Sequence, residues 1–146
     1  MASPRAYIKP SGFAMNVVNP FAIKFGFASS MVVRGRYSGQ LREVAVAPVT
    51  HGGIRYLVSL HGESDWVQNL RLARTCELHC HGLLERIRGI ETFGSVRDSV
   101  IATYRAKLGK AVDPYFRAYP DSRDHPVFRV EILTMQTQPL RPRRQP

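Results

Sequence analysis

A glycine pair between two apolar runs limits the possible folds of this chain more than any other feature. His51-Gly52-Gly53 separates the valine- and alanine-rich run Glu43–Val49 from the run Ile54–Ser59. Consecutive glycines supply the positive φ angles that a tight turn between strands needs. We therefore predict two antiparallel strands joined as a hairpin.

The other predicted strands follow the same plan. Cys76–Cys80 and Leu83–Thr92 predict a second hairpin, turned at His81-Gly82, and Val127–Thr134 predicts a last strand. The apolar segment Pro20–Val33 fits either a strand or a short helix, because its periodicity matches neither clearly.

Two longer helices and one short aromatic turn or helix are predicted between these strands. The first runs from Asp65 to about Arg74, with Asp65 as its cap and Gln68 as the capping-box partner. The second begins near Ser95, with Asp98 as its reciprocal partner, and stops at Gly109. The short one starts at Asp113-Pro114-Tyr115-Phe116.

This order, β-β-α-β-β-α-β, favours hairpins over βαβ crossovers. We expect a mostly β, antiparallel small barrel with helices packed outside, as a single domain over residues 1–136. Residues 1–11 are expected to be a mobile lead-in, and the basic, proline-rich residues 137–146 a disordered tail.

The chain is strongly basic. Its 146 residues include 21 Lys and Arg against 11 Asp and Glu, a formal net charge of +10. Such a charge favours an anionic partner, whether nucleic acid, a membrane surface or a phosphorylated small molecule. Two cysteines are too few for a disulfide framework, and neither a secretory signal nor a membrane-spanning run is apparent. The expected location is the cytoplasm.

The segment Gly35–Arg42 has the composition of an anion clamp. Arg36 and Arg42 offer guanidinium groups, Ser38 a hydroxyl, and Gly39 allows close backbone approach. The alternative is a glycine-containing turn with exposed charges. It is not a Walker loop, because the chain enters a strand and has no Gly-Lys-Ser/Thr.

Ser59–Asn69 places His61 and Gly62 between a strand and the start of a helix. A helix N-terminus offers free amide donors and partial positive charge to an anion. The alternative is structural, with Trp66 buried and Asn69 satisfying a nearby carbonyl.

Metal ligation is disfavoured for Cys76-Glu77-Leu78-His79-Cys80-His81. On a strand the cysteines face one way and the other ligand types face the opposite way, and no second cluster completes a site. Tyr104, Tyr115 and Tyr119 either line a pocket or pack in the core. Because no catalytic triad or carboxylate pair can be defended, any chemistry has to come from a cofactor.

Gly35-Arg36-x-Ser38-Gly39-x-x-Arg42, a hairpin, and then Ser59–Leu70 resemble the deazaflavin-dependent nitroreductase family, whose members are also described as F-420H2-dependent or quinone reductases. The resemblance spans about Arg34–Glu91 and continues weakly to Glu131. It implies a split β-barrel of the flavin-reductase type that binds coenzyme F-420, an 8-hydroxy-5-deazaflavin with a phosphate and an oligoglutamate tail.

The resemblance also implies roles for individual residues. The cofactor's anionic portion would contact Arg36, Tyr37, Ser38, Gly39 and Arg42. Its rings and ribityl chain would lie along the strand carrying Val44, Val46 and Pro48. The second strand end and helix start would contribute Val58, Ser59, Leu60, His61, Gly62, Asp65, Trp66 and Asn69. Tyr115 would close over the ring, and Tyr115 or Ser59 would polarise the acceptor's oxygen.

Two departures from the family pattern stand out. The loop before Trp66 is short and carries Gly62 only, and the segment before Gly35 does not read as a membrane-docking helix. A lipid quinone substrate is therefore not supported, and no stable membrane insertion is expected.

The leading hypothesis is an F-420H2-dependent reductase of an electron-poor small molecule, such as an enone, lactone, quinone or nitro compound. One alternative is a non-catalytic F-420 or flavin carrier. A nucleic-acid-binding barrel is disfavoured, because the strands carry valine, alanine and leucine in place of interleaved aromatic and basic residues. The expected state is a monomer or homodimer.

Overall fold

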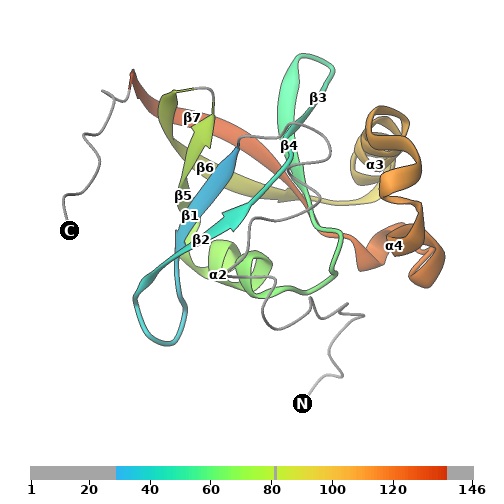
Figure 1. The fold of residues 1–146 in the computed structure, drawn as a ribbon, viewed down its shortest axis with the longest axis horizontal. Coiled ribbons are helices and arrows are strands. Elements are labelled where there is room, and N and C mark those ends of the chain that lie inside the picture. Colours follow the sequence, from blue (N-terminus) through green and yellow to red (C-terminus); the bar gives the residue numbers. More distant parts are fainter. Residues whose placement is uncertain (1–28, 81, 138–146) are drawn as a thin grey trace.

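A single antiparallel sheet organises the part of the chain that the computed structural model describes, residues 29–80 and 82–137. Its seven strands lie in the order β2-β1-β5-β6-β7-β4-β3, and the sheet curls without closing (Figure 1). The strands are β1 (Ser30–Arg34), β2 (Leu41–Ala45), β3 (Val49–His51), β4 (Ile54–Val58), β5 (Thr75–Cys80), β6 (Leu83–Thr92) and β7 (Val127–Thr137). The expected antiparallel β architecture with helices outside is confirmed.

Within the described residues, three α-helices flank the sheet. They are α2 (Asp65–Ala73), α3 (Gly94–Leu108) and α4 (Asp113–Ala118), with short 3-10 turns η2 (Gly109–Ala111) and η3 (Ser122–Asp124). Helix α3 lies beside β3 and β4 with α4 next to it, whereas α2 lies on the other side, near β1 (Figure 1). The expected element order was wrong, because the first four elements of the described part of the chain are all strands.

The predicted single strand Glu43–Val49 is wrong. Its first part belongs to β2, which pairs with β1, and its last residue begins β3, which pairs with β4. The strand breaks before Pro48, which has no N–H to give to a sheet ladder. The hairpin at Gly52-Gly53 is confirmed, with both glycines at positive φ, but it is shorter than predicted.

The helix caps also differ from prediction. Ser64, not Asp65, is the N-cap of α2, and Gln68 Nε2 donates to the Glu63 carbonyl oxygen at 2.7 Å. Phe93 precedes α3 in the N-cap position, and Asp98 accepts from Ser122 Oγ at 2.6 Å. Both predicted capping boxes are therefore wrong.

The predicted end of the second helix is right. Gly109 ends α3 at a φ of 59°. Leu83–Thr92 forms β6 as predicted, and the last strand continues past Thr134 to Thr137. In Pro20–Val33, the described residues from Ser30 onward are strand. The expected lead-in, His81, and the tail from 138 onward lie outside the described residues.

Two apolar clusters lie on opposite faces of β4. Leu57 packs into an inner cluster with α2 and β5, whereas Tyr56 and Val58 pack outward against α3 and α4. This split follows from the alternation of side chains along a strand. The loop that joins β4 to α2 follows directly and carries four of the predicted site residues, Ser59, Leu60, His61 and Gly62.

Candidate functional site

The turn Gly35–Gln40 joins β1 to β2 and is held by its own backbone. Gly35 N–H donates to the Gln40 carbonyl at 2.7 Å, and Gly39 N–H donates to the Gly35 carbonyl at 3.0 Å. Ser38 Oγ accepts from Gln40 N–H at 3.1 Å. A Cβ on Gly35 would lie 3.1 Å from that oxygen and 3.2 Å from the Gln40 carbonyl oxygen, so a larger residue there would require these atoms to shift. Tyr37, in this turn, is 89% exposed.

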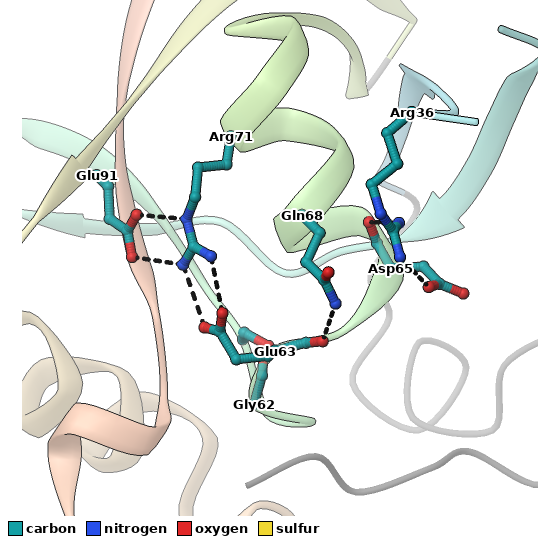
Figure 2. Close-up of polar contacts among 8 residues, drawn as sticks. Arg36, Gly62, Glu63, Asp65, Gln68, Arg71 and Glu91 are labelled. Atoms are coloured by element: carbon teal, nitrogen blue, oxygen red, sulfur yellow. Dashed lines mark hydrogen bonds and ion pairs between the residues drawn. The ribbon is translucent and has the colours of Figure 1, made fainter. Parts of the chain in front are cut away.

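Arg36 connects this turn to α2. Asn69 Oδ1 accepts from Arg36 N–H at 3.0 Å and from Arg36 Nη1 at 2.8 Å. Arg36 Nη2 lies 3.3 Å from Asp65 Oδ1 (Figure 2). Asn69 is buried and Asp65 is exposed. The structure thus brings together the two segments that the sequence singled out separately.

A pocket of about 340 Å³ lies at this junction. It is lined by Arg34, Gly35, Arg36, Tyr37, Ser38, Gly39, Asn69, Leu72 and Ala73. Arg42 lies outside this lining, on β2, with its Nε 3.8 Å from where a Cβ of Gly35 would be. Neither Arg34 nor Arg42 is in an ion pair within residues 29–80 and 82–137.

The loop Ser59–Ser64 is fixed around the Gly62 carbonyl. Ser59 Oγ donates to that oxygen at 2.7 Å, and Ser64 N–H donates to it at 2.8 Å. Gly62 has a φ of 70°. The Ser64 hydroxyl oxygen, at the N-terminus of α2, is buried and has no hydrogen-bond partner among the described residues. A buried orphan polar atom at a helix N-terminus is a feature that a ligand can satisfy.

Arg71 anchors the same loop from α2. Its guanidinium donates to both carboxylate oxygens of Glu63 and to both of Glu91 on β6 (Figure 2). The hydrogen bonds to Glu63, followed by those to Glu91, raise the pKa of Arg71. This network was not predicted from the sequence, because Glu63 and Glu91 lie 8 and 20 positions from Arg71 along the chain.

The predicted strand residues are mostly packing residues. Val58 and Leu60 are buried in the outer cluster, while Val44, Val46 and Trp66 pack partly buried against the inner one. The Pro48 carbonyl accepts from Lys107 Nζ at 3.5 Å. Trp66 contacts Phe128 with ring centroids 5.9 Å apart.

A second group gathers at the end of β4. The His61 and Tyr115 rings meet edge to face, with centroids 5.2 Å apart. Tyr115 is partly buried, and Ser59 is fully buried. Tyr104 packs in the outer cluster, where burial raises its pKa. His125, which the sequence analysis did not single out, contacts the Ser59 and Tyr119 carbonyls.

No group of three or more His, Cys, Asp or Glu side chains that could hold a metal lies among the described residues. Cys76 and Cys80 are buried and free, and His79 lies 3.6 Å from Glu77 on the other face of β5. None of the described helices is both long and apolar enough to cross a membrane.

The comparisons with solved structures establish the fold. An F420-H2 dependent reductase superposes with a TM-score of 0.56 at 20% identity, covering 70% of this chain and 92% of the other. The heme storage protein HutZ of Vibrio cholerae gives 0.58 at 11% identity, covering 82% and 94%. The chain has a split β-barrel fold of the flavin-reductase type.

A third split barrel is a protein of unknown function from Agrobacterium tumefaciens, with a TM-score of 0.59 at 14% identity. The match covers 74% of this chain but spans about half, 49%, of that protein. No protein-family pattern and no curated protein matches the sequence. At these identities the likeness extends to the fold alone.

Proposed function

We propose that this split barrel binds a deazaflavin cofactor of the F-420 type and reduces an electron-poor small molecule. The observation that carries the proposal is the bond pair from Arg36 to Asn69, which joins both segments of the family resemblance in one pocket. A fold neighbour described as an F420-H2 dependent reductase supports it.

The residues present fit such a cofactor. Arg34 and Arg42 offer guanidinium groups that form no ion pair with the described carboxylates, and guanidinium forks suit phosphate and carboxylate. The buried Ser64 hydroxyl at the start of α2 has no partner within residues 29–80 and 82–137, and an anionic group would supply one. We assign the anionic portion to this end, with Arg36, Tyr37, Ser38 and Gly39, and the ring to the end that carries His61 and Tyr115.

When bound in its reduced form, F-420 supplies a hydride to an activated C=C bond or a nitro group. The protein's contribution is to orient the acceptor and exclude water, which lowers the entropic part of the barrier. We assign the hydrogen bond to the acceptor's oxygen to Tyr115 and not to Ser59. The Ser59 hydroxyl already donates to Gly62 and would have to break that bond.

The second candidate function is a non-catalytic carrier of F-420 or a flavin. It is favoured by the engaged Ser59 hydroxyl, because a bound cofactor would then meet one fewer free donor. Steady-state oxidation of F-420H2 with a panel of enones, quinones and nitro compounds separates the two. Turnover supports the reductase, while tight binding without turnover supports the carrier.

Fluorescence titration with F-420 tests binding itself. Arg42→Ala should weaken binding, and the loss should be larger at low salt, because ions screen exposed charges. Arg88→Ala is the matched control, since it removes an exposed arginine paired with Glu131 away from the pocket. An absence of binding at micromolar wild-type protein would overturn the proposal, and heme or FMN titrated in parallel shows whether another cofactor binds.

A further inference from the structure

His125 lies between the short turn η3 and β7 with its side chain completely buried. Its Nδ1 lies 3.0 Å from the Ser59 carbonyl oxygen, and its Nε2 lies 2.7 Å from the Tyr119 carbonyl oxygen. Both contacts are within hydrogen-bond distance, and both partners can only accept.

The two acceptors are the geometric evidence that bears on the charge of this ring. A neutral imidazole carries one N–H, so one buried carbonyl would face a nitrogen lone pair, whereas an imidazolium donates to both. None of the ion pairs within residues 29–80 and 82–137 includes His125. The stabilising partners are therefore the two carbonyls and the Phe116 ring, whose centroid is 4.2 Å away.

Arg105 brings a cation to the Phe116 ring that contacts His125. The Arg105 guanidinium carbon is 4.7 Å from the Phe116 ring centroid, and Arg105 Nη2 is 3.7 Å from Asp113 Oδ1. Asp113 partly neutralises the charge of Arg105. The Phe116 ring and the two carbonyls therefore remain available to stabilise a positive charge on His125.

The His125 contacts join the two segments that carry the candidate catalytic residues. Ser59 begins the loop that carries His61, and its N–H donates to the Pro126 carbonyl at 2.9 Å. Tyr119 ends α4, and its N–H donates to the Tyr115 carbonyl at 3.1 Å. The loop and α4 meet again where the His61 and Tyr115 rings touch.

We propose that His125 is a buried imidazolium and a positioning residue, which ties the Ser59 carbonyl to the Tyr119 carbonyl and thereby holds Tyr115 against His61. The effect on an acceptor rests on the proposed function. The charge of the ring and its hold on Tyr115 do not depend on it.

Nitrogen-15 NMR of the imidazole rings in the wild-type protein tests the charge directly. We expect both His125 nitrogens to carry protons that exchange slowly with water. A single N–H on this ring at neutral pH would overturn the proposal.

His125→Gln tests the positioning. His51→Gln is the matched control, because His51 Nδ1 contacts Thr103 Oγ1 at 2.8 Å and, among the described residues, bonds to neither of the two carbonyls that contact His125. Nuclear Overhauser contacts between the His61 and Tyr115 rings should disappear in His125→Gln and persist in the control. Their persistence in His125→Gln would overturn the proposal. If His125→Gln does not fold, the wild-type NMR still decides.

A kinetic readout addresses the acceptor. His125→Gln should lower kcat by about 10- to 100-fold, as a misplaced group does, while the Kd for F-420 stays close to the wild-type value. An unchanged kcat would overturn the positioning role in the reaction. Wild-type protein that neither binds F-420 nor turns over would contradict the proposed function instead, and the NMR results would still stand.

Discussion

Asn69 Oδ1 accepts two hydrogen bonds from Arg36, one from its backbone N–H and one from its guanidinium. The acceptor sits on the buried side of α2, and the donor lies in the turn between β1 and β2. Because Asn69 is buried, this pair fixes the position of the turn relative to the helix. The exposed ion pair of Arg36 with Asp65 adds charge at the same point.

Asn69→Ala should lower the free energy of unfolding by about 1–3 kcal/mol, because it leaves two donors of Arg36 without their acceptor. Asp65→Asn is the control. Its ion pair is 3.3 Å long and its side chain is 68% exposed, so its loss should cost at most about 1 kcal/mol. Urea unfolding of both variants measures this, and equal losses would contradict the ranking.

Glycine turns and apolar runs in the sequence were enough to predict those strands that end at a turn or next to a helix. The Gly52-Gly53 turn and the β6 limits follow from glycine chemistry and apolar runs that do not depend on distant partners. The division of Glu43–Val49 into two strands could not be predicted, since it depends on which neighbour each half pairs with. Pro48 was the available signal for the break.

The candidate site was predictable at the level of segments only. The glycines, arginines and helix start identified both halves, but the Arg36 to Asn69 bonds link residues 33 positions apart. His125 carried no local signal, because both of its partners are backbone carbonyls, and that of Ser59 lies 66 positions away along the chain. Every residue has a backbone carbonyl whatever its side chain, so the residue types at Ser59 and Tyr119 do not indicate that their carbonyls contact His125.

Gly89 on β6 allows α2 to pack closely on the sheet. A Cβ at this position would lie 2.8 Å from Leu70 Cδ2. Gly89→Ala should therefore lower the free energy of unfolding by about 1–3 kcal/mol through overpacking. In a Leu70→Ala background the same change should cost much less, because the space is then free. A double-mutant cycle in urea measures the coupling, and strictly additive losses would contradict this packing argument.

Arg55 on β4 and Glu85 on β6 form a bidentate ion pair, in which Nη1 donates to Oε1 at 2.8 Å and Nη2 donates to Oε2 at 2.6 Å. The hydrogen bond to Glu85 raises the pKa of Arg55. Glu85 is only 4% exposed and Arg55 27%, so Arg55→Met should cost about 3 kcal/mol by leaving a buried carboxylate unpaired. Arg55→Met combined with Glu85→Leu should recover most of that loss. Thermal or urea unfolding checks this, and a double variant as unstable as Arg55→Met would oppose it.

Cys76 should be unreactive toward alkylating reagents while the protein is folded. Burial, followed by the Glu77 charge, raises its pKa to about 12, and the thiolate is the reactive form. At pH 8 the folded protein should therefore show very slow iodoacetamide labelling at Cys76, measured by mass spectrometry of the peptides. In urea, where the thiol returns to a pKa of about 8.5, labelling should become fast. Rapid native labelling of Cys76 would mean that the inner cluster opens on the timescale of the reaction, and amide hydrogen exchange in β5 would then show matching loss of protection.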